Sequence, residues 1–291
     1  MTAGAINFND PFVLAFAGGI AIALVSSVLS VFVVLRRMAF VGEGIAHSAF
    51  GGAGVALLMG LFLSDFQPAL ARDGIIAAFC IAAAITIGTL SRRGKLSEDT
   101  SIGIILVTSM AIGVVLRDIR QHLVDIGFVA NGSYAPSFEA LLFGQIFAMN
   151  QTDVILAWIL AAVSILLIAL TFKELTFFAF DEETATVFGV RTGLFYYGLL
   201  ILLGLAVVLA MRSLGIILVG AVLILPGAAA KMISQRIGRL TVLSAAFGIV
   251  GMTVGLLLSL WLDFLSAGPV VALTYCTIFA VCYTISKTKS N

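Results

Sequence analysis

The sequence predicts an all-α, polytopic integral membrane protein with about eight or nine transmembrane helices. Hydrophobic residues make up 61% of the 291 residues and charged residues only 11%, whereas soluble domains carry about 25% charged residues. A soluble fold of this size has no way to cover so much apolar surface, so lipid must surround it. The apolar residues also come in separate runs of the length that crosses a bilayer.

Nine apolar runs are long enough for a span, which takes about 20 mostly apolar residues. They lie at residues 11–35, 38–64, 74–90, 99–116, 152–172, 193–211, 213–230, 240–262 and 268–286. The stretch 136–149 is shorter and predicts an interfacial or re-entrant helix, so we expect eight or nine spans. The break at Arg212–Gly215 predicts either a helical hairpin or one broken unit. Pro226 interrupts the seventh run, as a hinge or as a tolerated kink.

The placement of Lys and Arg orients the spans, because cytoplasmic loops carry an excess of these residues. Twelve of the 16 fall in one set of loops: Arg36, Arg37, Arg92, Arg93, Lys95, Lys173, Arg191, Lys231, Arg236, Arg239, Lys287 and Lys289. Nine spans then place the N-terminus outside, the C-terminus inside and residues 117–151 on the extracytoplasmic side. Scattered basic residues also argue against nucleic-acid binding. No soluble domain or long linker occurs, so residues 1–291 predict a single transmembrane domain.

The second run carries two ionisable residues at membrane depth, Glu43 and His47. In a helix that starts near Met38 and rises about 1.5 Å per residue, they lie about 8 Å and 14 Å from its start. A charge there costs at least about 2.5 kcal/mol, so such residues persist where they face a partner, a water-filled path or an ion. The i,i+4 spacing puts both side chains on one helix face. Gly51 and Gly54 continue that face and favour close approach of another helix.

A carboxylate oxygen and a neutral imidazole nitrogen suit a divalent transition metal. One chain supplies two ligands, whereas two copies at a two-fold axis would supply two oxygens and two nitrogens, a set compatible with Mn²⁺, Zn²⁺ or Fe²⁺. Magnesium would prefer oxygens alone, and copper(I) would prefer sulfur. The alternative is a structural pair, in which Glu43 bonds Arg36 or Arg37 and His47 donates to a backbone carbonyl. The spacing alone leaves both interpretations open.

The segment LRRMAFVGEGIAHSAFGG (35–52) resembles the permease subunits of zinc/manganese-type metal ABC transporters, the membrane subunits of bacterial binding-protein-dependent metal importers. In that family two Arg and an aromatic-Gly step precede an acidic residue, and Ala-His follows. Further segments resemble the family in the same order along the chain: ALLFGQIFAMNQTD (140–153), FFAFDEETATVFGV (177–190), LGIILVGAVLILPGAAAKM (214–232) and SAGPVVAL (266–273). The resemblance therefore covers nearly the whole chain.

This resemblance implies a single permease domain of the type II ABC importer kind, multi-pass in the plasma (inner) membrane. It implies a homodimer that works with cytoplasmic ATP-binding cassette ATPase subunits and an extracytoplasmic metal-binding protein. It places the metal ligands of the translocation path at Glu43 and His47, with the divalent metal as transported substrate and no permanently bound cofactor. The family usually has Asp where this chain has Glu43, a difference that bears on which metal is preferred.

The loop 173–192 is the expected docking site of the ATPase subunits. Asp181, Glu182 and Glu183 form a helix-opening acidic cluster that complements the helix dipole, and Gly189 fits the stop position after the helix. A short amphipathic helix between two spans is the coupling element that the resemblance also implies. The alternative is a solvated interfacial helix with no partner.

No P-loop pattern (G-x-x-x-x-G-K-S/T) occurs, so we expect a transport subunit rather than an enzyme, with ATP hydrolysed by separate subunits. The outer segment carries Asp118, His122, Asp125 and Glu139, interpreted as ordinary solvated residues rather than a metal relay. An alternative function is an ABC permease for an iron chelate or cobalamin, which predicts a wide, mostly uncharged path. A gradient-driven secondary cation transporter normally needs several intramembrane acids, and an intramembrane metalloprotease needs a third metal ligand.

Overall fold

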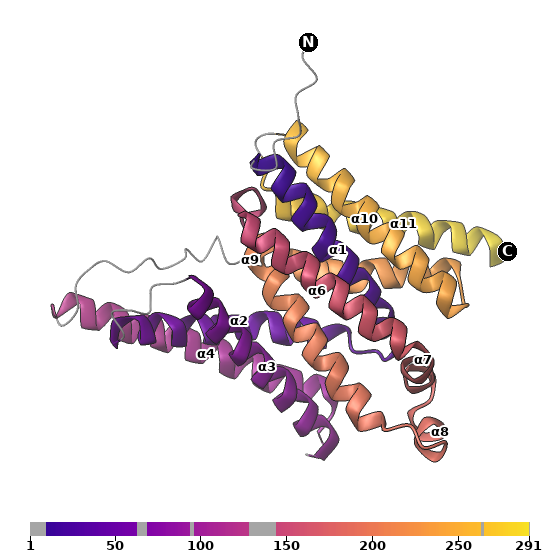
Figure 1. Ribbon diagram of the computed structural model, residues 1–291, viewed down its shortest axis with the longest axis horizontal. Coiled ribbons are helices and arrows are strands. Elements are labelled where there is room, and N and C mark those ends of the chain that lie inside the picture. Colours follow the sequence, from indigo (N-terminus) through magenta and orange to yellow (C-terminus); the bar gives the residue numbers. More distant parts are fainter. Residues whose placement is uncertain (1–9, 63–68, 94–95, 128–143, 263–264, 291) are drawn as a thin grey trace, which may run out of the picture. The chain divides into compact units, whose positions relative to one another are not determined.

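The computed structural model describes residues 10–62, 69–93, 96–127, 144–262 and 265–290, and these ranges are almost entirely helical (Figure 1). The elements are α1 (Pro11–Leu35), α2 (Ala39–Phe62), α3 (Ala69–Arg93), α4 (Glu98–Asp125), η1 (Ile146–Ala148), α6 (Gln151–Leu170), α7 (Phe172–Phe180), α8 (Glu182–Val187), α9 (Thr192–Ile233), α10 (Ile237–Trp261) and α11 (Ala267–Ser290). No strand occurs within the described ranges. The predicted all-α class is therefore confirmed.

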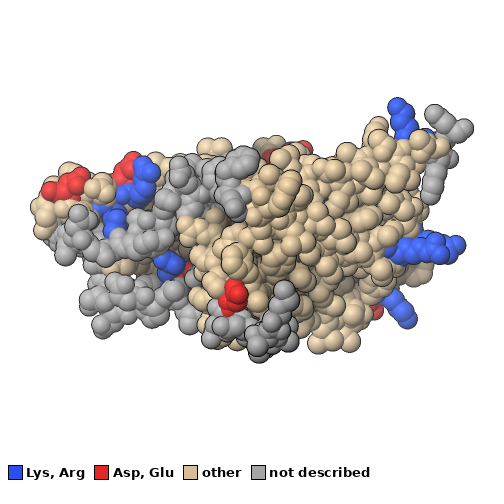
Figure 2. Space-filling model, turned by 90° about the horizontal axis from the view of Figure 1, so that it is seen from above, with Lys and Arg blue, Asp and Glu red and all other residues tan. Residues whose placement is uncertain are grey.

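Eight helical segments among the described residues are long and apolar enough to cross a membrane, with α9 counted as two. A ninth long helix, α2, has 24 residues and contains Glu43, His47 and several glycines. The prediction of about eight or nine transmembrane helices is thus confirmed. Figure 2 shows a broad surface without Lys, Arg, Asp or Glu, as contact with lipid requires. Of the short stretch 136–149, residues 136–143 lie outside the described residues, and the remainder contains the single turn η1.

The break in α9 lies at Gly215, where φ is 78° and ψ is 162°. A Cβ atom added at Gly144, itself at φ 68°, would lie 2.3 Å from the backbone nitrogen of Gly215. Backbone therefore packs directly on backbone here, which two residues without side chains permit. The break that the sequence predicts at Arg212–Gly215 therefore lies at Gly215, where two helical segments meet.

Pro226 lies inside the second half of α9 without breaking it. Ser30 on α1 compensates for the local disturbance. Its hydroxyl accepts a hydrogen bond from the Gly227 N–H at 2.9 Å and donates to the Ile224 carbonyl at 3.2 Å. A neighbouring serine is one of the ways in which membrane helices satisfy the backbone around a proline. Pro226 is therefore a tolerated kink in this conformation, and the local distortion of α9 lies at Gly215.

Contacts divide the described residues into two compact units, each of which is described by itself. In the first, α1 lies between α6 and α10, and α10 also packs on α11 (Figure 1). Small residues bring these helices close, as in other membrane bundles. The Ser244 hydroxyl donates to the Ser27 carbonyl at 2.5 Å, and the Tyr275 hydroxyl donates to the Gly248 carbonyl at 2.6 Å. These bonds link α1, α10 and α11 through groups that lipid would leave unsatisfied.

The second unit comprises α2, α3, α4 and residues 196–208 of α9. The glycines of α2 form its packing surface. A Cβ at Gly51 would lie 2.6 Å from the Phe79 ring of α3, and one at Gly54 would lie 2.9 Å from the Gly113 Cα of α4. Ordinary contacts between carbon atoms lie at about 3.5–4.0 Å. The predicted close approach to α2 is confirmed, and the approaching helices are α3 and α4 of the same chain.

Candidate metal site and coupling element

Glu43 and His47 lie one turn apart on α2 and are hydrogen-bonded to each other. The distance from His47 Nε2 to Glu43 Oε1 is 3.0 Å. The His47 side chain is 21% exposed and the Glu43 side chain is 36% exposed, so the rest of the chain does not fully enclose either of them. The i,i+4 spacing in the sequence predicted this shared face, because residues four apart are neighbours on a helix.

The rest of the His47 ring is held by its surroundings. It stacks on Phe50 with 6.4 Å between ring centroids and 12° between the planes. Within the described part of the chain, the buried Nδ1 atom has no hydrogen-bond partner. The structural pair considered from the sequence required an Arg bond to Glu43 and a carbonyl bond to His47. Instead, Glu43 bonds His47, and Arg36 pairs with Glu182.

The separation of the two atoms suits a metal held between them. The 3.0 Å between Nε2 and Oε1 is the span of two metal–ligand bonds of about 2.1 Å that meet at about 90°. Among the described residues no group of three or more His, Cys, Asp or Glu is placed to hold a metal. The pair therefore offers one carboxylate oxygen and one imidazole nitrogen on the same helix face.

The acidic cluster of the predicted coupling loop opens the short helix α8, as expected. Asp181 is its N-cap, and the carboxylate accepts a hydrogen bond from the Thr184 N–H at 2.9 Å. Bonds from the Thr184 hydroxyl and backbone hold the pKa of the Asp181 carboxyl below its usual range. At the other end, Gly189 has φ 84°, its N–H donates to the Thr186 carbonyl, and the next N–H donates to the Ala185 carbonyl. This is a Schellman motif, so Gly189 ends the helix as the sequence indicated.

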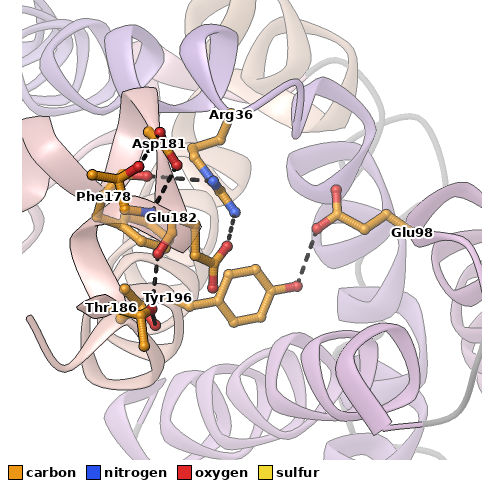
Figure 3. Close-up of polar contacts among 9 residues, drawn as sticks. Arg36, Glu98, Phe178, Asp181, Glu182, Thr186 and Tyr196 are labelled. Carbon is orange, nitrogen blue, oxygen red and sulfur yellow. Dashed lines mark hydrogen bonds and ion pairs between the residues drawn. The ribbon is translucent and has the colours of Figure 1, made fainter.

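The three acids of the cluster have different surroundings, and Figure 3 shows those of Asp181 and Glu182. Asp181 caps the helix, and Glu183 is exposed. Glu182 forms an ion pair with Arg36, with side-chain exposures of 25% and 19%. The sequence pattern groups Glu182 with its neighbours and gives no sign of this role of Arg36, which lies 146 residues away. The exposed apolar side chains beside the acids, Val187 at 84% and Phe188 at 75% exposure, were also missed.

A second polar contact joins the start of α9 to the α3–α4 connection. The Tyr196 hydroxyl donates to Glu98 Oε1 at 3.3 Å (Figure 3), and the Arg92 guanidinium lies 4.6 Å from the centre of the Tyr196 ring. A cation over an aromatic face is a stabilising arrangement. The second turn of α9, which contains Tyr196, is therefore held against the ends of α3 and α4.

The outer end of α4 carries most of the residues first considered as a metal relay. Asp118 accepts a bond from Arg117 at 3.0 Å, and Asp125 accepts one from Gln121 at 2.9 Å. His122 is exposed in the last turn of the helix. Glu139 lies outside the described residues. The two Asp residues thus have local partners, in agreement with their interpretation as solvated side chains.

Comparison with known proteins places this fold and these residues in a family. The sequence model described as the ABC 3 transport family matches residues 9–286. A Thermotoga maritima protein named as a probable metal transport system membrane protein is 33% identical over 259 residues, which are 89% of this chain and 84% of that protein. The manganese transport system membrane protein MntC of Listeria monocytogenes is 30% identical over 264 residues, 91% of this chain and 86% of that one.

The structural comparison agrees with the sequence comparison. The structure of PsaBC from Streptococcus pneumoniae in complex with Fab has a chain that matches with a TM-score of 0.74 and 28% sequence identity. The match covers 93% of this chain and 90% of that chain. The arrangement of the helices is therefore shared along almost the full length.

Proposed function

Because this chain belongs to the ABC 3 transport family, we propose that it is the membrane-spanning subunit of an ATP-driven importer of a divalent transition metal. It is a multi-pass membrane protein and a transport subunit rather than an enzyme. Membership of an ABC permease family also implies association with an ATPase and with a substrate-binding protein. The secondary-transporter and metalloprotease alternatives do not fit this family.

The observation that carries the proposal is the Glu43–His47 pair in the spanning helix α2. The pair is costly in a membrane unless it serves an ion or a polar path, and its oxygen and nitrogen lie 3.0 Å apart. Manganese is the cargo we favour, since relatives such as MntC are named as manganese transport proteins and a set of oxygen and nitrogen ligands is compatible with Mn²⁺. An iron-chelate or cobalamin permease would give His47 no role.

Two ligands are too few for a transport site, so the proposal includes a second copy of the chain. Two permease domains, each spanning residues 1–291, would bring two Glu43–His47 pairs to one path. The pair is partly exposed on its own chain, which leaves it available to such a partner. An extracytoplasmic binding protein would deliver the metal from the outer side, and release inward would follow rearrangement of the two copies.

The coupling role of residues 173–192 rests on the surface around α8. Val187 and Phe188 are exposed apolar side chains next to the exposed acid Glu183. Exposed apolar groups with polar neighbours are typical of protein interaction sites. We therefore assign this surface to the cytoplasmic ATPase. Replacing Val187 with Glu should reduce co-purification of the ATPase, whereas the same change at Leu265, which is exposed in the loop before α11, should not.

The decisive experiment measures uptake of radioactive Mn²⁺ into proteoliposomes that contain the permease and its ATPase. His47→Ala and Glu43→Gln should abolish uptake at low metal concentration, because each removes a ligand. His122→Ala is the matched control, since it removes the other histidine of the chain without touching the pair, and should transport normally. ATP dependence without sensitivity to uncouplers is expected. Normal Mn²⁺ uptake by both pair variants would refute the proposal.

A further inference from the structure

Arg36 connects the end of α1 to the coupling element. It follows the last residue of α1 as its C-cap, and its guanidinium forms an ion pair with Glu182 of α8. One of its amino groups donates to the Phe178 carbonyl of α7 at 3.3 Å, and the guanidinium carbon lies 4.3 Å from the centre of the Phe178 ring (Figure 3). Three contacts of different kinds therefore fix one side chain to two neighbouring helices.

These contacts are better shielded than an ordinary surface ion pair. The two charged side chains are only 19% and 25% exposed. Exposed pairs contribute little because water screens them and long side chains lose freedom. Here the planar guanidinium is held by an ion pair, a carbonyl and an aromatic face, an arrangement for which arginine is suited and lysine is not. A movement of α8 would therefore act on Arg36 directly.

Arg36 also belongs to the turn from which α2 starts. The Met38 N–H donates to the Val33 carbonyl at 2.9 Å, and Arg37 between them adopts φ 59°. This is a Schellman turn with a non-glycine residue in the left-handed conformation. Helix α2 begins at Ala39, and Glu43 follows seven residues after Arg36. Only seven positions along the chain therefore separate Arg36 from Glu43, and the hydrogen bond from Met38 to Val33 fixes the turn between α1 and α2.

We propose that Arg36 is a positioning residue of the transport cycle, whose ion pair with Glu182 transmits movement of α8 to the turn that leads into α2. This rests on the proposed docking of the ATPase at α8 and on the proposed metal role of α2. Glu182 then has an internal task, because its carboxylate is occupied by Arg36. Glu183, exposed on the same turn, is the acid that faces the ATPase.

The experiment compares full complexes of permease and ATPase in proteoliposomes. Arg36→Gln and Glu182→Gln each remove one charge of the pair, and Asp99→Asn is the control, because it removes one exposed acid in the first turn of α4, outside the docking surface and the pair. Three quantities are measured for each: co-purified ATPase, the rate of ATP hydrolysis, and Mn²⁺ taken up per ATP hydrolysed. Both pair variants should retain the ATPase but lower uptake per ATP by about fivefold or more, the lower end of typical coupling between sites.

The double variant Arg36→Glu with Glu182→Arg tests the ion pair itself. It restores a pair of opposite charges, although the contacts to Phe178 are lost. Its uptake per ATP should therefore be well above that of Arg36→Glu alone or Glu182→Arg alone. Arg36→Lys keeps the charge without the planar fork, and its uptake per ATP should fall between those of the native protein and Arg36→Gln. Because Arg36→Lys and the swap preserve the charge balance, they remain informative if a neutral variant fails to assemble.

Several outcomes would overturn the inference. Uptake per ATP within about twofold of native in both neutral variants, below typical coupling effects, would show that the pair transmits nothing. An equal loss in Asp99→Asn, or a swap no better than the single reversals, would do the same. Loss of co-purified ATPase in Glu182→Gln would make Glu182 a docking contact instead. Absence of Mn²⁺ uptake by the native complex would refute the proposed function and is distinguishable from each of these results.

Discussion

Replacing Gly113 with Ala should destabilise the second unit by forcing α2 and α4 apart. The new Cβ would lie 2.5 Å from the Phe50 carbonyl oxygen and 2.7 Å from its carbon. Close contacts between carbon and oxygen begin at about 3.3 Å, so the helices must separate by about 0.8 Å. Both contacting atoms belong to backbone, which has no rotamer with which to yield. Overpacking of this kind costs about 1–3 kcal/mol.

Gly103 provides the matched control on the same helix. A Cβ there would meet nothing within 4 Å, so Gly103→Ala gains only the helix propensity of alanine, about 1 kcal/mol. Gly113→Ala gains the same helix propensity, so the difference between the two variants in the free energy of unfolding measures the cost of overpacking alone. Thermal unfolding in detergent should therefore place the midpoint of Gly113→Ala below that of Gly103→Ala. Because α2 carries Glu43 and His47, Mn²⁺ uptake should fall as well. Equal midpoints and unchanged uptake would refute this reasoning.

Three further changes test other parts of the structure. Arg37 has a left-handed backbone conformation, which only glycine adopts without cost. Arg37→Gly should therefore be about 1 kcal/mol more stable than Arg37→Ala, as measured by thermal unfolding in detergent. Ser30→Ala should lower the free energy of unfolding by about 1–3 kcal/mol, because it leaves the Gly227 N–H without its hydrogen bond. The control Ser26→Ala loses no hydrogen bond among the described residues and should melt like the native protein. Because the pKa of Asp181 is lowered, its helix cap is fully effective above the ordinary Asp value of 3.8 and is lost as the pH falls through the lowered pKa. Amide hydrogen exchange in residues 182–187, corrected for its intrinsic dependence on pH, should therefore rise at acidic pH in the native protein. In Asp181→Asn the corrected exchange should not change with pH.

Most of the helices followed from the sequence because each depends on a local property. A run of about 20 apolar residues is enough to indicate a span, and the i,i+4 spacing of Glu43 and His47 is enough to place their side chains together on one face. The cap at Asp181 and the stop at Gly189 are equally local. Each of these features is decided by residues within a few helical turns, so it does not depend on how the helices pack against one another.

The features that were missed depend on residues far apart in the chain. The Arg36–Glu182 pair joins residues 146 positions apart, and nothing in the spacing of either segment selects one acid of the cluster over its neighbours. The close packing at the Gly215 break likewise depends on Gly144, which lies in a different segment. Sequence patterns report local geometry, whereas these choices are made by packing between helices.

The contact between Gly144 and Gly215 affects how natural variation in relatives should be interpreted. Both positions have positive φ, and the Gly144 Cα approaches the other backbone too closely for any side chain. A saturation mutagenesis screen should therefore find both positions as intolerant as a cargo ligand, although neither has a side chain with which to bind anything. Invariance of Gly144 and Gly215 across transporters of different cargo would then reflect the packing of backbone on backbone rather than recognition of the cargo.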